Sequence, residues 1–128
     1  MKEILVDTNA AVDFMRGDPA ALQRYRTGWT ILLPVHVVGE LFFGAFLSQL
    51  AESNVAIVED LARTWRLIAP TMDTARIYGR LRAREATLLS PAKINDLWIA
   101  ALCLQHNLPL LTNDGGFDRI PGLNVVHW

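Results

Sequence analysis

Short apolar runs alternate with longer segments of helical periodicity along the whole chain. The short runs are rich in Ile, Leu and Val and end at Gly, Pro or polar residues, which is typical of buried strands. We expect strands at about 3–6, 29–33, 65–68, 108–112 and 124–126, and helices at about 9–15, 19–26, 35–50, 55–63, 71–87 and 94–104. Strands that alternate with helices predict a single α/β domain over residues 1–128, with a parallel sheet and helices on both faces.

Polar residues beside the apolar segments mark several helix ends. Ser53 and Asn54 could cap the helix over residues 55–63. The helix that ends near residue 104 could begin at Ser90 or only at Ile94, and the sequence leaves both starts open. Asn107 follows this helix and suits the left-handed conformation that closes many helices.

The predicted helix over residues 35–50 carries few polar side chains. These residues, with one glycine, recur every four positions and form a narrow stripe: His36, Glu40, Gly44 and Ser48. Most other positions are apolar, including Phe42, Phe43 and Phe46. A helix that is apolar almost all round is buried on more than one side. In a chain of this size we expect one side to contact a partner; the alternative is a helix at the centre of the chain's own core.

The composition is that of a globular protein. The chain has 128 residues, of which 52% are hydrophobic, and this fraction argues against disorder. Its apolar runs are too short to span a bilayer, and we expect no signal peptide, because a strand follows the first residues at once. Cys103 is the single cysteine, so we expect no internal disulfide, a packing role for this thiol and a reducing, cytoplasmic location.

The charged residues are unevenly distributed. The net charge of −1 disfavours a nucleic-acid partner when taken alone, but the balance becomes positive if a cation neutralises a cluster of acids. Seven of the 12 Lys and Arg residues lie between positions 63 and 93. Among them, Arg76, Arg80 and Arg84 are spaced four residues apart and share one helix face. This face could bind RNA phosphates or could be an ordinary solvated surface.

Four acidic residues are expected at the carboxyl edge of the sheet, where open parallel sheets bind ligands. Asp7 and Asp114 follow the first and fourth strands, and Glu40 and Asp96 lie near the starts of two helices. Each has a plainer alternative: a helix cap for Asp7, a favourable helix-dipole position for Asp96, a turn for Asp114 and solvent for Glu40. Their coincidence at one edge favours a site.

Clustered carboxylates favour a hard divalent cation. Without one they repel one another, and some of them must bind protons. Mg²⁺ prefers oxygen ligands, and a pair of such ions can hold the attacking and leaving oxygens of a phosphoryl displacement. No His or Cys cluster in the sequence supports zinc instead. His36 could reach the site along its stripe, although a lone histidine is more often structural.

Several segments together resemble the PIN domain family. They are Leu-Val-Asp-Thr-Asn at 5–9, Val-Gly-Glu-Leu at 38–41, Asn-Asp-Leu-Trp-Ile-Ala-Ala at 95–101 and Leu-Leu-Thr-Asn-Asp at 110–114. The closing Phe-Asp-Arg-Ile-Pro-Gly-Leu at 117–123 and the short length are similar to the VapC toxin branch of that family. The resemblance covers the whole chain in the right order.

This resemblance implies a parallel five-stranded sheet and a Mg²⁺- or Mn²⁺-dependent endoribonuclease, the toxin of a type II toxin–antitoxin pair. It also implies a homodimer and a cognate VapB-like antitoxin that lies along a groove and blocks the acids. The acidic residues of the family, which are the expected catalytic residues and metal ligands, fall on Asp7, Glu40, Asp96 and Asp114. Thr112 and Asn9 are expected to orient carboxylates or water, and Asp118 is an additional acid outside the ligand set.

Other classes of protein fit part of the pattern. A phosphoacceptor receiver domain would need an acidic pair after the first strand and an Asp after the third, which the chain lacks. A haloacid-dehalogenase-like phosphatase would need a second Asp where Asn9 stands. Two alternatives stay open: a PIN-fold nuclease that processes RNA outside a toxin–antitoxin pair, and a protein that binds RNA or a partner without cutting.

Overall fold

The computed structural model describes residues 2–26, 28–88 and 90–128. Its five strands form one sheet in the order β3-β2-β1-β4-β5, and all neighbouring strands run parallel. The strands are β1 (Glu3–Val6), β2 (Thr30–Pro34), β3 (Arg66–Ile68), β4 (Leu110–Leu111) and β5 (Val125–Val126). The parallel sheet predicted from alternating strands and helices is therefore confirmed.

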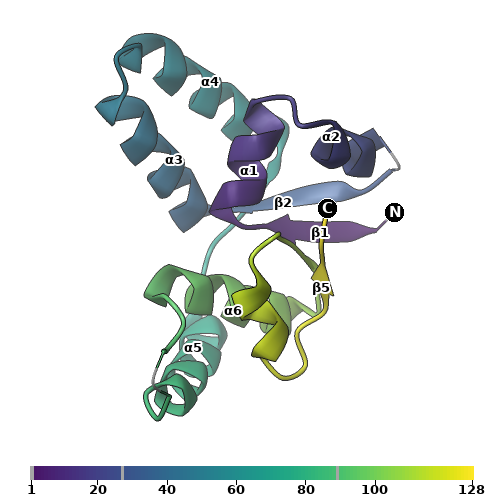
Figure 1. Ribbon diagram of the computed structural model, residues 1–128, viewed down its shortest axis with the longest axis vertical. Helices are drawn as coiled ribbons and strands as arrows, with labels where there is room; N and C mark the ends of the chain where they lie inside the picture. Colours follow the sequence, from purple (N-terminus) through teal and green to yellow (C-terminus); the bar gives the residue numbers. More distant parts are fainter. Residues whose placement is uncertain (1, 27, 89) are drawn as a thin grey trace.

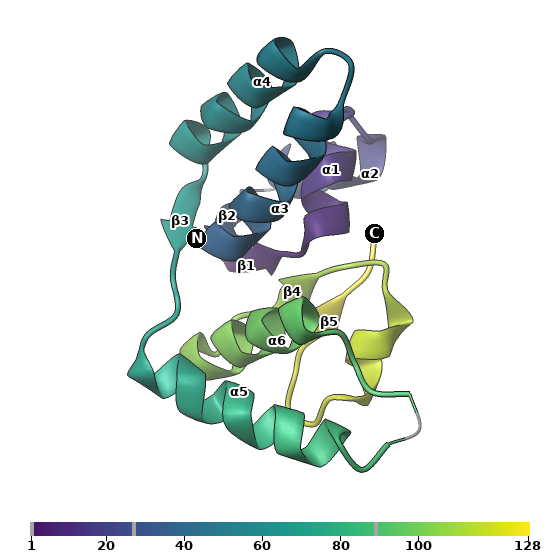
Figure 2. The same cartoon turned by 90° about the vertical axis from the view of Figure 1, so that its left-hand side faces the viewer.

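The central position of β1 explains its unbroken apolar sequence. Ile4, Leu5 and Val6 are at most 1% exposed, because helices cover both faces of the sheet. One face carries α1 (Thr8–Met15), α2 (Pro19–Arg26), α3 (Val35–Leu47) and α4 (Ala51–Thr64), and the other carries α5 (Met72–Glu85) and α6 (Ile94–His106) (Figures 1 and 2).

The turn between α3 and α4 lies several residues earlier than predicted. Ser53 and Asn54 lie inside α4, so the prediction that they cap it is wrong. The Asn54 amide instead donates to Ser48 Oγ (2.8 Å), and Ser48 Oγ donates to the Ala45 carbonyl (2.6 Å). These side chains close the turn, because Ser and Asn bind nearby backbone and side-chain groups as readily as they cap helices.

Most other boundaries agree with the sequence. α6 begins at Ile94, which decides between the two starts that were open. Asn107 follows α6 with a φ of 52°, and its predicted left-handed conformation is confirmed. α5 ends at Glu85, slightly earlier than expected. β4 has two residues and is shorter than predicted, since Pro109 before it has no N–H to donate to a neighbouring strand.

α3 and α6 differ in how far the fold buries them. α6 is a core helix, as predicted, through Leu97, Ile99, Ala100, Ala101, Leu102 and Cys103. α3 buries Val37 and Leu41, but Phe43 and Phe46 are 62% and 68% exposed. The alternative that α3 lies wholly inside the core is therefore wrong, and its outer face is open to a partner. Within the described ranges, no helix combines the length and hydropathy needed to cross a bilayer.

Candidate functional site

The carboxyl ends of β1 and β4 place Asp7 and Thr112 side by side. Val6 pairs with Leu111 across these neighbouring strands, so the next residue of each leaves the sheet at the same edge. Asp7 Oδ1 accepts the Ala10 N–H (2.8 Å) and caps α1, while Oδ2 accepts the Thr112 hydroxyl. Asp7 is only 4% exposed, and its carboxylate orientation is fixed at both oxygens.

Thr112 also connects Asp7 to Asp114. Thr112 Oγ1 accepts the Asp114 N–H (3.0 Å). Asp114 Oδ1 accepts the Gly116 N–H (2.9 Å) and caps η1, the short 3₁₀ helix Gly115–Arg119. A side chain at Gly116 would crowd this carboxylate, because a Cβ there would lie 3.2 Å from Oδ1. The two acids therefore share the Thr112 hydroxyl as a common support.

Glu40 and Asp96 approach the same edge from two helices. Asp96 lies in the first turn of α6, and the Glu40 carboxylate on α3 accepts a hydrogen bond from Asn95 Nδ2 (2.9 Å). A cleft of about 180 Å³ is bordered by Asp7, Thr8, Asn9, Glu40, Lys93, Asn95, Asp96 and Asp114. The structure thus brings the four acids and Asn9 to one cleft.

Three residues at the cleft had not been singled out from the sequence: Thr8, Lys93 and Asn95. Lys93 is the N-cap residue of α6, and its charge lies near enough to Asp96 to act on the pKa of that carboxyl. The sequence could have predicted the position of Lys93, because a residue directly before the helix that carries Asp96 is expected at the same sheet edge.

Burial and mutual repulsion raise the pKa values of two site acids. Burial raises the pKa of Asp7 and outweighs the hydrogen bonds that its carboxylate accepts. Burial also raises the pKa of Asp96, with added repulsion from Asp114 and Asp7, while Lys93 acts in the opposite direction. Ionising these groups together is therefore unfavourable, and a cation in the cleft would relieve the repulsion.

The donor atoms around the cleft fit a hard divalent ion in kind. They are carboxylate, amide and hydroxyl oxygens, and none of the described residues on its border is His or Cys. In the part of the chain that the structure describes, no three His, Cys, Asp or Glu side chains are grouped as ready-made metal ligands. Mg²⁺ needs no such cage, because it keeps several waters and binds through one or two carboxylates. The cleft suits a hydrated ion with few direct protein contacts.

His36 and Asp118 do not border this cleft. Burial lowers the pKa of His36, which favours its neutral ring. Asp118 lies 3.2 Å from His127 Nε2, and Nδ1 of the same ring lies 2.7 Å from the Thr112 carbonyl oxygen. In this arrangement neither residue supplies a ligand to the cleft.

The three arginines expected to bind RNA lie on α5 and do not border the cleft. Arg76 pairs with Asp73 (3.0 Å), and Arg84 Nη2 donates to the Arg119 carbonyl (3.4 Å). Arg80 is exposed. Any contact between RNA and this face would therefore lie outside the acidic cleft.

Comparisons with known proteins agree with this architecture. The family model of the PIN domain matches residues 4–123. A curated relative, the tRNA(fMet)-specific endonuclease VapC of Shigella flexneri, is 26% identical over 132 residues that cover 100% of this chain and 99% of the relative.

Two solved structures share the fold over nearly the full length. The chain matched in DNA-bound VapBC from Salmonella typhimurium superposes with a TM-score of 0.91 at 26% identity, covering 100% of this chain and 99% of that one. VapBC-1 from nontypeable Haemophilus influenzae gives a TM-score of 0.87 at 26% identity and 98% coverage of both chains. With a family match that spans almost every element described above, the chain belongs to the PIN domain family.

Proposed function

We propose that this chain is a divalent-metal-dependent endoribonuclease and the toxin of a toxin–antitoxin pair. The observation that carries the proposal is the cleft that Asp7, Glu40, Asp96 and Asp114 border together. Relatives named as VapC endonucleases and the VapBC structures support the ribonuclease and toxin roles. A reducing cytoplasm, where RNA substrates are found, is the location that suits this activity.

The proposed reaction is hydrolysis of an RNA phosphodiester. The oxygen of water forms a bond to phosphorus, the bond between phosphorus and the 3′ oxygen breaks, and the products carry a 5′-phosphate and a 3′-hydroxyl. A bound Mg²⁺ or Mn²⁺ supplies an acidified water and charge stabilisation at the phosphate. Lys93 borders the cleft and adds a positive charge where the phosphate would lie.

Asp7 and Asp96 are the proposed main ligands, with Glu40 and Asp114 completing the acidic wall. Each Asp7 oxygen accepts one hydrogen bond and retains a lone pair for a cation or its water. Thr112 holds Asp7 in that orientation, and Asn9 at the rim is proposed to orient water.

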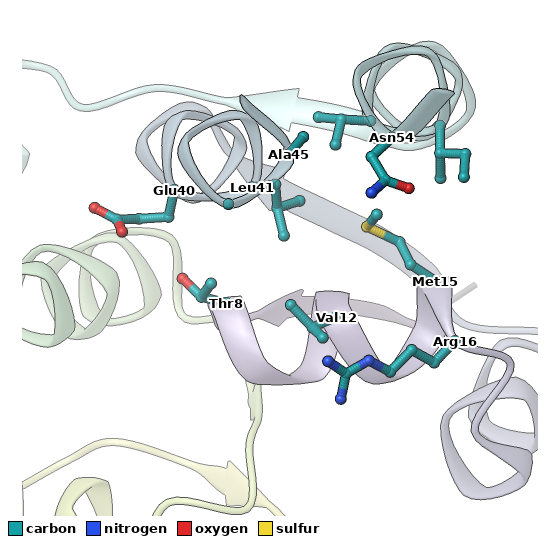
Figure 3. A pocket seen from close by; sticks show the side chains of 11 residues that line it. Thr8, Val12, Met15, Arg16, Glu40, Leu41, Ala45 and Asn54 are labelled. Carbon is teal, nitrogen blue, oxygen red and sulfur yellow. The ribbon is translucent and has the colours of Figure 1, made fainter. Parts of the chain in front are cut away.

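A groove that leads to the acidic cleft is the proposed binding site for a segment of the antitoxin. A groove of about 350 Å³ lies between α1, α3 and α4, and Figure 3 shows the side chains of Val12, Leu41 and Ala45 along it, with Arg16 and Glu40 at opposite ends. An amphipathic segment could place apolar anchors in this groove. Because Glu40 borders both groove and cleft, an arginine of that segment could pair with the carboxylates and displace the ion.

A homodimer is proposed from the outer face of the α3–α4 hairpin. The hairpin exposes the large apolar side chains of Phe43, Phe46, Leu47 and Leu50. Exposed apolar side chains concentrated on one helical hairpin are typical of an interface.

The test is cleavage of RNA by the purified chain in Mg²⁺, in Mn²⁺ and in excess EDTA. Asp7→Asn and Asp96→Asn are each expected to lower cleavage by roughly 100-fold or more, because a lost ligand costs more than a lost outer contact. Arg63→Gln is the matched control, since its pair with Asp60 lies on the exposed surface of α4. Full activity of Asp7→Asn, or undiminished cleavage in EDTA, would refute the proposal; RNA binding without cleavage would favour a non-cleaving binding protein.

A further inference from the structure

A buried glutamate at the end of α5 joins three segments of the chain. Glu85 is 1% exposed, which is rare for a carboxylate unless it is paired. Its Oε1 accepts the Ala92 N–H (2.9 Å) and Nη2 of Arg119 (2.8 Å). The same Arg119 nitrogen also donates to the Ser90 carbonyl (3.0 Å). One buried oxygen therefore gathers α5, the loop before α6 and the end of η1.

The two segments that Glu85 joins are those that carry two of the site acids. Ala92 lies just before α6, whose first turn contains Asp96. Arg119 is the last residue of η1, which Asp114 caps. Both segments face one recess of about 130 Å³, whose border includes Ala92, Lys93, Asp96, Asp114 and Arg119.

The ionic contact between Glu85 and Arg119 is better suited to fixing the position of the two segments than to filling space in the core. An apolar group of similar volume is often as stabilising as a buried ion pair, but it cannot fix direction as charge-assisted hydrogen bonds do. Burial by itself would raise the pKa of Glu85, yet the Ala92 hydrogen bond and the contacts with Arg119 and Arg84 lower it. The carboxylate is therefore ionised at neutral pH, and its Oε1 accepts hydrogen bonds from both partners.

We infer that Glu85 is a positioning residue for the proposed metal site, because it sets the spacing between the start of α6 and η1. Asp96 and Asp114 lie on these two segments, so their separation follows that spacing. Thr112 holds Asp114 from the β4 side, and the link between Arg119 and Glu85 holds the other end of η1. This inference rests on the proposed function, and it predicts weaker ion binding when Glu85 is changed although every ligand remains.

The experiment measures Mn²⁺ affinity of the full metal-free chain by electron paramagnetic resonance of free Mn²⁺. Glu85→Gln and Arg119→Gln should each weaken Mn²⁺ binding by about 10–100-fold, the range for lost outer contacts of a metal site. The double variant should lose no more Mn²⁺ affinity than the more strongly affected single variant, because the two residues act as one unit. Arg63→Gln, which breaks an exposed ion pair on α4, should bind Mn²⁺ like the wild type.

A purely structural role predicts a different result. Measured well below the Tm of each variant, the folded protein would then bind Mn²⁺ with wild-type affinity, and this outcome overturns the inference. With positioning, saturating Mn²⁺ restores most of the RNA cleavage, because the ligands are intact. Additive losses in the double variant would also overturn the shared role.

The test must also cover a variant that does not fold and a wild type that shows no activity. If Glu85→Gln does not fold, Arg119→Gln carries the test, since the Arg119 side chain is 40% exposed. A wild type that neither binds Mn²⁺ nor cuts RNA overturns the proposed function and this inference with it. An active wild type beside an Arg119→Gln variant of unchanged Mn²⁺ affinity overturns the inference alone.

Discussion

Asp7 shows that a helix cap and a site residue need not be alternatives. One carboxylate oxygen accepts the Ala10 N–H, and the other accepts the Thr112 hydroxyl. Such a cap contributes about 1 kcal/mol to helix stability, whereas burial of the charge opposes folding. Asp114 likewise caps η1 and borders the cleft. The cap and the proposed site role of both acids are compatible, because a carboxylate has lone pairs for more than one partner.

Asp96→Asn should stabilise the metal-free protein at neutral pH. Burial, with repulsion from Asp114 and Asp7, raises the folded-state pKa of Asp96. Asp96 therefore contributes to the free energy of unfolding below its unfolded pKa of about 3.9, and this contribution is lost as pH rises through its folded pKa. Without the charge, we expect Tm near pH 7 to rise by a few degrees, the shift of about 1 kcal/mol in a small domain. Thermal melts in EDTA measure this, with the exposed Asp73→Asn as control.

Mg²⁺ should reverse that order of stability. An ion held by the proposed site would stabilise the folded wild type and raise its Tm by mass action, whereas Asp96→Asn lacks a proposed ligand. If Mg²⁺ shifts both proteins equally, Asp96 does not hold the ion.

The α3–α4 hairpin has an inner face that builds the core and an outer face that exposes apolar side chains such as Phe43 and Phe46. Phe42 packs partly against the core, while Phe46, whose ring centroid lies 6.3 Å from that of Phe42, is 68% exposed. Phe46 is therefore a sharper test of an interface than Phe42, because a change at Phe42 also disturbs the core.

Phe46→Glu should weaken self-association by at least about tenfold and leave the free energy of unfolding within about 0.5 kcal/mol of wild type, as expected for a surface change. Phe42→Glu should instead destabilise the fold by about 2 kcal/mol or more, because it places a charge against the core. Sedimentation velocity and urea unfolding separate the two effects. A wild type that stays monomeric at high micromolar concentration would remove the dimer from the proposal.

The arginines of α5 also differ from one another. Arg84 Nη1 lies 3.6 Å from buried Glu85, so reversing the charge of Arg84 would disturb the fold as well as any RNA contact. The sharper variant is Arg76→Glu with Arg80→Glu, in an Asp7→Asn background that does not cut. We expect weaker RNA binding and a salt dependence whose slope falls by roughly two. Unchanged affinity and slope would mark this face as an ordinary solvated surface.

At the scale of the whole molecule, the buried charge of Glu85 should make the assembly of α5, α6 and η1 sensitive to acid. Although burial opposes it, the hydrogen bonds and the positive charges of Arg119 and Arg84 lower the folded-state pKa of Glu85 below 4.5. The stability that Glu85 contributes is therefore complete above the unfolded value and is lost as pH falls through the folded value. The difference in urea midpoint between wild type and Glu85→Gln should shrink as pH falls below the unfolded pKa of about 4.3. A constant difference would show that the charge of Glu85 does not stabilise the fold.

Elements that are determined by the properties of their own residues were predicted well. β1 is apolar at every position from Ile4 to Val6, as a strand covered on both faces must be, and Asn107 has the left-handed conformation that its side chain tolerates. The turn between α3 and α4 was misplaced, because Ser48 and Asn54 bind each other across it. Local capping preferences contain no information about such a contact.

Alternation and periodicity were enough for the fold class and for the gathering of acids at one edge, because parallel strands bring their carboxyl ends together. The contacts that shape the site join residues far apart in the chain: Asp7 with Thr112, Glu40 with Asn95, and Glu85 with Arg119. Periodicity tells which face of a helix is apolar, but it does not tell which distant side chain will meet it. The strand order places β4 beside β1, and only that arrangement brings Thr112 to Asp7.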